Sequence, residues 1–115
     1  MLLTSAEVAR ATGDKVVSAT PLSYSCVYGL GYPQSVTSMN APYPDVFEEN
    51  KSGYEPKPIA GLGADAYCIT IAAIEKIPGG GRINVKLTDG RVYQIWGTYS
   101  CEQLLPLARA AVARN

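Results

Sequence analysis

Few side chains in this 115-residue sequence could carry out catalysis. It has no histidine, and histidine is the commonest general base and the commonest metal ligand. A Ser–Lys arrangement would need Ser23, Ser25 or Ser35 to meet Lys15 or Lys86, and no spacing in the sequence supports one. The sequence therefore predicts a protein that is not an enzyme, with a small hydrolase as the least favoured alternative.

Acidic side chains gather in one segment. Glu48 and Glu49 are adjacent, and Asp45 and Glu55 lie nearby in the chain. Two carboxylates can act together as a general acid and a general base. Charged residues on a short helix are more often only solvated, and that interpretation is favoured here. Asp65 is a lone carboxylate, so it does not predict a cation site, and we expect neither a metal nor a cofactor.

The three cysteines, Cys26, Cys68 and Cys101, lie far apart and form no Cys-x-x-Cys motif, so no zinc site is predicted. An oxidising compartment would give one disulfide and one remaining thiol, whereas a cytoplasmic protein would keep three buried thiols. A Cys68–Cys101 bond is expected to be awkward, because the two residues are predicted at opposite ends of a strand and a disulfide needs Cα atoms within roughly 7 Å. If one bond forms, Cys26 is the favoured partner.

Tyrosines give the best indication of binding. Tyr28, Tyr32 and Tyr43 lie around Gly- and Pro-rich turns together with Tyr24, and Tyr54 follows. Tyrosine in adaptable loops is typical of recognition surfaces, because it supplies contact area at low entropic cost. The alternative is that these rings are buried in strands with only their hydroxyls in water. The hypothesis is a partner-binding surface of Tyr28, Tyr32, Tyr43 and Tyr54, and it requires the first three to be exposed on one side.

Composition narrows the classes of partner. Ten Lys and Arg balance ten Asp and Glu, so there is no basic field for nucleic acid and no polybasic patch for a membrane. No apolar run approaches the roughly 20 residues that span a bilayer. Met1 and Leu2 stand close to a predicted helix, and we interpret the chain as a mature segment from which any targeting region has been removed.

Residues 64–115 are predicted to form three strands and a helix. Ile83, Val85 and Leu87 alternate with polar residues, as expected of a strand with one face on a core. Asp89-Gly90 favours a two-residue type I′ turn. Trp96 in the next strand is expected to pack in the core under the last helix.

Glycines and helix caps complete this prediction. The Gly79–Gly81 run is expected to be a flexible loop, and it lacks the Lys-Ser/Thr pair of a phosphate-binding loop. Capping boxes predict helices after Thr4 (with Glu7) and after Ser100 (with Gln103). Pro106 lies either inside the last helix or at its start.

The remaining segments are two short strands, a short helix after Asp45 and a long irregular loop over residues 54–63. The sequence thus predicts a single α+β domain over residues 1–115. Its architecture would be a two-layer sandwich, in which an antiparallel sheet of about five strands carries N- and C-terminal helices.

Four segments resemble a family of small actinobacterial lipoproteins of unknown function. These are the opening Leu-Leu-Thr-x-x-Glu-Val over residues 2–8, Cys26-Val27-Tyr28, the Gly-Leu-Gly-Ala-Asp-Ala-Tyr stretch over residues 61–67, and Leu-Ala-Arg-Ala-Ala over residues 107–111. The resemblance implies an extracytoplasmic domain tethered through a lipid anchor that is absent from this chain. It implies no enzymatic activity and no disulfide pattern.

The expected function is a non-enzymatic binding domain at the cell envelope, with a protein or a small ligand as its partner. A proteinaceous inhibitor of a secreted enzyme, inserting an exposed Tyr-Gly loop, is one alternative. A cytoplasmic immunity-type protein is another, and it applies if the native chain starts at Met1.

Overall fold

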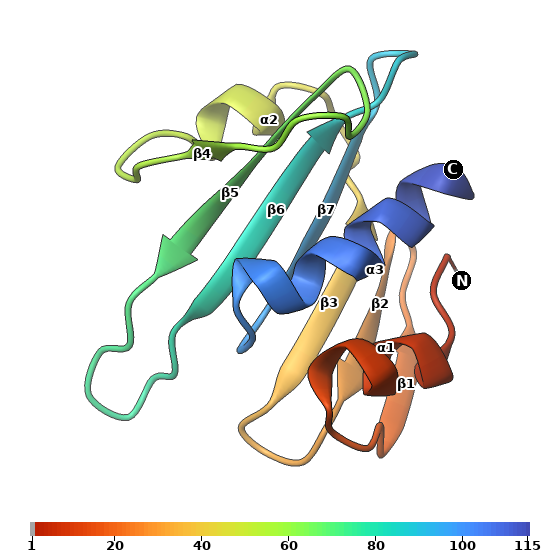
Figure 1. Ribbon diagram of the computed structural model, residues 1–115, viewed down its shortest axis with the longest axis vertical. Helices are drawn as coiled ribbons and strands as arrows, with labels where there is room; N and C mark the ends of the chain where they lie inside the picture. The colour runs from red at the N-terminus through yellow and green to blue at the C-terminus, as the bar shows by residue number, and fades with distance from the viewer. Residues whose placement is uncertain (1) are drawn as a thin grey trace.

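Two helices lie on one face of a twisted antiparallel sheet, and a short third helix lies near the far edge (Figure 1). The computed structural model describes residues 2–115. The helices are α1 (Ser5–Thr12), α2 (Val46–Glu49) and α3 (Cys101–Ala113). The strands are β1 (Ser18–Pro21), β2 (Ser25–Gly29), β3 (Ser35–Asn40), β4 (Lys57–Pro58), β5 (Asp65–Ile71), β6 (Gly80–Lys86) and β7 (Val92–Gly97).

Within residues 2–115 the sheet has seven strands, in the order β1-β2-β3-β7-β6-β5-β4, rather than the five predicted. The α+β class, the antiparallel sheet and the helices at both ends are confirmed. The two additional strands are the edges. β1 is exposed at all four of its residues, and β4 contributes two residues inside the segment expected to be irregular. Edge strands this short and polar lack the alternation that identifies a strand.

Both predicted capping boxes are present. Thr4 and Ser100 each accept a hydrogen bond from the backbone three residues on, and the side chains of Glu7 and Gln103 return the contact. α3 therefore begins at Cys101, and Pro106 lies inside it. The caps satisfy backbone groups at the start of each helix and so fix where α1 and α3 begin.

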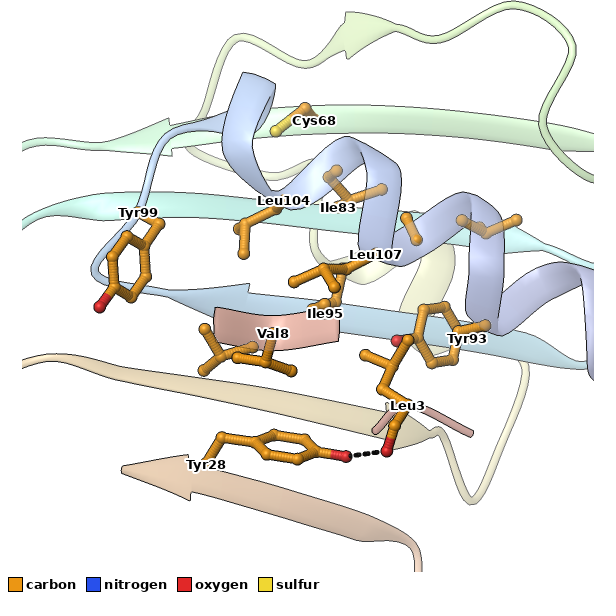
Figure 2. Packing of buried hydrophobic residues seen from close by; sticks show 14 of the residues in the cluster. Leu3, Val8, Tyr28, Cys68, Ile83, Tyr93, Ile95, Tyr99, Leu104 and Leu107 are labelled. Carbon is orange, nitrogen blue, oxygen red and sulfur yellow. Dashed lines mark hydrogen bonds between the residues drawn. The ribbon is translucent and has the colours of Figure 1, made fainter. Parts of the chain in front are cut away.

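The face of the sheet under α1 and α3 is called the inner face here, and it holds the larger core. Figure 2 shows Val8 of α1 together with Leu104 and Leu107 of α3 packed over side chains of the central strands. Ile83 and Ile95 are fully buried there. The predicted inward alternation of Ile83, Val85 and Leu87 is confirmed, since all three are buried.

The opposite, outer face is only partly covered. α2 packs on it through Phe47, and Phe47 forms a second cluster with Tyr67, Ile69 and Val92. The Phe47 and Tyr67 rings meet edge to face at 5.0 Å, and the Tyr67 hydroxyl donates to the Phe47 carbonyl at 2.6 Å. This small third layer was not part of the predicted two-layer sandwich.

The turn between β6 and β7 differs from the prediction. Gly90 N–H donates to the Leu87 carbonyl and Leu87 N–H donates to the Arg91 carbonyl, so three residues form the loop. Gly90 has φ of 89°, whereas Asp89 is not left-handed, and a type I′ turn requires both. The loop is a type I turn closed by a left-handed glycine, and the Asp89 carboxylate accepts from Arg91 N–H at 3.0 Å.

The glycine run is a tight corner rather than a flexible loop. Gly80 and Gly81 belong to β6, and a Cβ on Gly80 would collide with the Gly97 carbonyl of β7. A Cβ on Gly81 would lie 2.9 Å from the backbone nitrogen of Cys101. The backbones approach so closely that only glycine fits, which lets the chain cross β6 on its way into α3.

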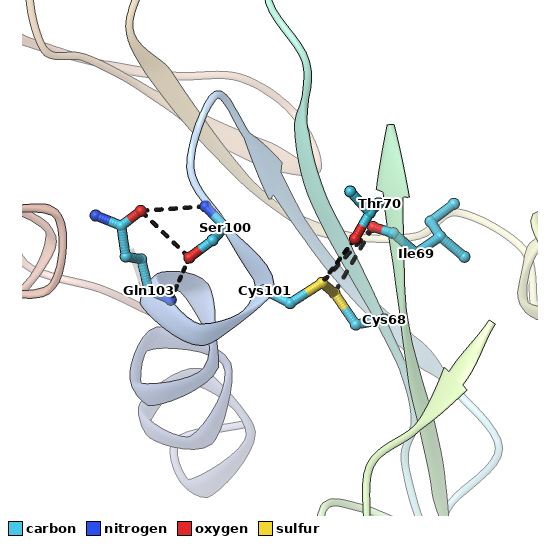
Figure 3. Close-up of a disulfide and its surroundings, with 6 residues drawn as sticks. All are labelled: Cys68, Ile69, Thr70, Ser100, Cys101 and Gln103. Atoms are coloured by element: carbon cyan, nitrogen blue, oxygen red, sulfur yellow. Dashed lines mark hydrogen bonds between the residues drawn. A yellow bond between two sulfur atoms is a disulfide. The ribbon is translucent and has the colours of Figure 1, made fainter. Parts of the chain in front are cut away.

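This crossing explains the disulfide. Cys68 and Cys101 are bonded, with Cα atoms 6.2 Å apart, so the expectation that this pair is too distant and that Cys26 takes part is wrong (Figure 3). The strand order of the meander was predicted correctly. The error was to place Cys101 beside the end of β7. In the structure Gly81 N–H donates to the Tyr99 carbonyl, and the chain after β7 turns back across β6.

Candidate functional site

Tyr28, one of the four proposed partner-binding residues, is in the core. It is fully buried on the inner face, and its hydroxyl donates to the Leu3 carbonyl at 2.6 Å (Figure 2). Burial raises the pKa of this hydroxyl well above its usual value. The prediction that Tyr28 is exposed is wrong. Tyr28 lies two residues after Cys26, so both side chains point to the buried side of β2.

The other proposed tyrosines are exposed, but they do not share one surface. Tyr32 is fully exposed in the β2–β3 loop, whereas Tyr43 follows the opposite end of β3. A six-residue strand such as β3 separates its two ends by about 16 Å. The expectation that Tyr28, Tyr32 and Tyr43 lie on one side is therefore also wrong.

Tyr54 follows α2 in the segment that leads to β4, and it is 46% exposed. It is thus accessible, and within residues 2–115 no hydrogen bond joins its side chain to Tyr43 or Tyr24. The four tyrosines of the hypothesis therefore divide into one core residue, one residue at the β2–β3 loop and two that flank α2 in the sequence.

Three large side chains gather at the end of the sheet that carries the β1–β2 and β6–β7 turns. Leu22 is 59% exposed, Tyr24 62% and Tyr43 51%. The backbone joins their loops, because Asn40 N–H donates to the Tyr24 carbonyl and Ala41 N–H donates to the Val92 carbonyl, both at 2.9 Å. We call Leu22, Tyr24 and Tyr43 the turn-end surface.

Two shallow hollows flank the end of β3 at this surface. One, of about 350 Å³, is lined by Leu22, Tyr24 and the polar Asn40. The other, of about 360 Å³, is lined by Tyr43 and Arg91. Arg91 is held by a 2.7 Å ion pair with Asp89 and reaches Asn115 at 3.3 Å. Exposed apolar rings beside hollows with polar rims are typical of protein interaction sites.

The opposite end of the sheet exposes apolar residues at separate corners. Ile74 and Ile77 are 66% and 69% exposed at the tip of the β5–β6 loop, and Tyr32 is on the β2–β3 loop. Figure 1 shows these two loops diverging from one another. The exposed apolar residues of these two loops therefore form two separate protrusions rather than one surface.

Trp96 lies on the outer face, so its predicted place under the last helix is wrong. Its neighbours on β7, Tyr93 and Ile95, are the ones that face α1 and α3. Across the sheet Trp96 pairs with Thr37 on β3 and with Arg82 on β6. The Arg82 guanidinium lies over the Trp96 ring, 5.2 Å from its centroid, in a cation–π contact.

The outer face also buries polar groups, among them Asn84, which the alternating pattern had predicted to be in water. Asn84 is fully buried and Gln94 is 2% exposed, and Gln94 Nε2 donates to Asn84 Oδ1 at 2.6 Å. Two donors there have no acceptor within residues 2–115, namely Asn84 Nδ2 and Arg82 Nε. A buried donor left without a partner costs about 1–3 kcal/mol. Arg82 Nε and Asn84 Nδ2 together therefore destabilise the fold measurably.

Positive charge surrounds the same place. Arg82 Nη1 donates to Asn50 Oδ1 over a long 3.4 Å, and Lys51 Nζ lies 5.4 Å from the Tyr67 ring. Burial raises the pKa of Tyr67 to about 12, with the nearby Glu48 carboxylate contributing. Lys51 is paired with Glu48 at 3.3 Å, but within residues 2–115 no carboxylate forms an ion pair with Arg82.

The acidic segment forms no paired-carboxylate site. Glu48 contacts Lys51, Glu49 is exposed, and Asp45 caps no backbone group with its side chain. Within residues 2–115, no group of three or more Asp, Glu or Cys side chains is placed to hold a metal ion. Glu48 and Glu49 are both exposed on α2.

The disulfide is suited to a structural role. Cys101 is half-buried at the start of α3 and lines a groove with Lys57 and Thr70, whereas Cys68 is 4% exposed. Cys26 is not part of the disulfide and is buried.

Comparisons with known proteins give no match: no family model, no curated protein and no solved structure is similar to this chain. The arrangement of side chains is therefore the basis for any functional proposal. Tyr24 and Tyr43 were visible in the sequence, whereas Leu22, Arg82 and Asn84 were not predicted as site residues.

Proposed function

We propose that the protein is a non-enzymatic binding domain that works outside the cytoplasm and engages a protein partner through the turn-end surface. The observation that carries this proposal is the gathering of Leu22, Tyr24 and Tyr43, each more than half exposed, at one end of the sheet. Exposed apolar side chains that form a contiguous patch mark interaction sites, whereas single exposed residues do not. Tyrosine anchors also give large contact areas at low entropic cost.

The location is supported by one feature. A disulfide between Cys68 and Cys101 is compatible with an oxidising, extracytoplasmic compartment. No helix within residues 2–115 is long and apolar enough to cross a bilayer. Attachment to a membrane through a lipid anchor outside this chain belongs to the proposal.

The test is affinity capture from the envelope and secreted fractions of a native host, with tagged wild-type protein and two matched variants. Tyr24→Ala combined with Tyr43→Ala should lose the captured protein, because it removes both exposed rings from the turn-end surface. Tyr32→Ala, at the other end of the sheet, should keep it. Both variants should keep the wild-type melting temperature, since none of these rings is in the core.

A second candidate is an inhibitor that inserts the Tyr32 loop into the cleft of a secreted enzyme. It rests on the complete exposure of Tyr32 next to a left-handed Gly31, which has φ of 89°. In the same experiment this function reverses the result: Tyr32→Ala loses the partner, and the double variant keeps it. Capture that survives in both variants contradicts both functions.

A further inference from the structure

The outer face of the sheet carries hydrogen-bond donors in excess of the acceptors around them. Arg82 and Asn84 are two residues apart on β6, so their side chains leave the same face. Arg82 Nε and Asn84 Nδ2 are both buried and have no acceptor within residues 2–115. The side-chain acceptor of Asn84, Oδ1, already accepts a hydrogen bond from the Gln94 side-chain amide.

We propose that this place, made of Arg82, Asn84, Trp96 and Asn50, binds a carboxylate group; we call it the Arg82 patch. A carboxylate has only acceptor sites and enough of them for several donors. A guanidinium matches it with two parallel N–H···O bonds and compensates its charge. A neutral acceptor would satisfy the hydrogen bonds but would leave the Arg82 charge without a counter-ion.

The surroundings hold Arg82 ready for such a ligand. The Trp96 ring supports one face of the guanidinium at 5.2 Å, which leaves the N–H groups at its rim to make contacts. Asn50 takes up only Nη1, over 3.4 Å. Lys51, next to Asn50, lies over the rings of Phe47 and Tyr67, and its charge is paired with Glu48.

The carboxylate contacts the terminal nitrogens first, because Nε and Asn84 Nδ2 are enclosed in the unbound protein. Contact with the two enclosed donors then requires the Arg82 side chain to shift along the Trp96 ring and uncover Asn84 Nδ2. The carboxylate can belong to a small organic acid or to an acidic side chain of a protein, and the chemistry of recognition is the same.

Trp96 is the one tryptophan of the chain, so its fluorescence reports directly on this place. The protein is titrated with sodium acetate and, separately, with a short alanine peptide that contains one glutamate, each against sodium chloride at equal ionic strength. A saturable change in Trp96 fluorescence is expected, together with shifted ¹⁵N resonances of Arg82 Nε–H and the Asn84 amide. Equal affinity for both probes indicates a small acid, and tighter binding of the peptide indicates a protein side chain.

Arg82→Gln should weaken binding by about tenfold or more, the usual effect of removing a charged hydrogen-bond donor. Arg109→Gln is the matched control and should bind like wild type, because Arg109 is exposed on α3, which covers the inner face. The proposal is overturned if no probe shifts the wild-type Arg82 and Asn84 resonances, or if chloride produces the same change. The resonance measurement needs no variant, so it stands even if Arg82→Gln fails to fold.

This inference is independent of the turn-end surface. None of Leu22, Tyr24 and Tyr43 belongs to the Arg82 patch, and the patch is tested with defined probes rather than by capture. A protein that does not bind acetate can therefore still have the proposed function. A failed capture experiment likewise leaves the Arg82 patch in place.

Discussion

The inner and outer faces of the sheet are built from the same strands, but they treat buried polar groups differently. On the inner face, the hydroxyls of Tyr28, Tyr93 and Tyr99 each have a partner, in the Leu3 carbonyl, Ser38 and Asp14. On the outer face, Arg82 and Asn84 keep donors without acceptors. The comparison teaches that these buried hydroxyls of the inner face are satisfied within the protein, whereas two buried donors of the outer face are not.

Removing the disulfide is the largest expected loss and tests how far the inner face depends on it. The bond closes a loop with a sequence separation of 33 residues. Loop-closure entropy then predicts a loss of about 3–4 kcal/mol in the free energy of unfolding for Cys68→Ala with Cys101→Ala. Urea unfolding measures it. Reductant should destabilise the wild type similarly and leave the variant unchanged, and a variant as stable as the oxidised wild type contradicts the prediction.

Tyr28→Phe should cost less and tests whether inner-face hydrogen bonds stabilise the fold. It leaves the buried Leu3 carbonyl without its donor, so the expected loss is about 1–2 kcal/mol. The matched control, Tyr32→Phe, removes the same atom from a fully exposed ring and should change nothing. Equal stability of the two variants would show that the Tyr28 hydroxyl contributes nothing.

The ion pair that joins α1 to the end of α3 should give a smaller effect with a defined pH dependence. Hydrogen bonds from the Arg114 guanidinium and the Thr4 backbone lower the pKa of Glu7 to about 2. A carboxylate whose pKa is lowered by folding stabilises the protein above its unfolded pKa of about 4.3. That contribution is lost as pH falls toward 2.

The corresponding measurement follows wild type and Glu7→Gln by denaturant midpoint over this pH range. The wild type should be the more stable above pH 5, and the two curves should converge near pH 2. Added salt should reduce the difference, because the side chains of Glu7 and Arg114 remain partly exposed. A difference that persists unchanged at pH 2 would mean that the charge of Glu7 is not its source.

The smallest expected effect concerns the outer face. Asn84→Leu with Gln94→Met replaces both partners of a buried amide pair by apolar groups of similar size, which is often neutral or stabilising. We expect an unfolding free energy equal to or above that of the wild type, in contrast to Tyr28→Phe. A loss as large as that of Tyr28→Phe would show that the two faces do not differ as described.

Local signals in the sequence were reliable. The two capping boxes and the alternation of Ile83, Val85 and Leu87 depend on neighbours within a few residues, and the structure contains all of them. The edge strands β1 and β4 were missed, because their residues are exposed and carry no periodic signal. The α+β class could thus be predicted, but the width of the sheet could not.

Features that depend on distant backbone contacts were predicted poorly. The Cys68–Cys101 bond requires the chain to cross β6 after β7, and that path depends on Gly81 and Tyr99. The side of the sheet that receives Trp96 could not be fixed, because β7 carries apolar residues on both faces. Tyr24 and Tyr43 could be chosen as exposed tyrosines, but their common end of the sheet follows only from the pairing of the strands.

The corner of Gly80, Gly81 and Gly97 has a consequence for finding related proteins. Because the backbone itself occupies the space of a Cβ at each position, any chain that makes the same crossing must keep glycine there or move its strands apart. Side chains elsewhere can diverge far beyond recognition while this spacing of 80, 81 and 97 persists. A search for distant relatives should therefore use the spacing of Gly80, Gly81 and Gly97, with Cys101 four residues after the last glycine, rather than the residues of the core.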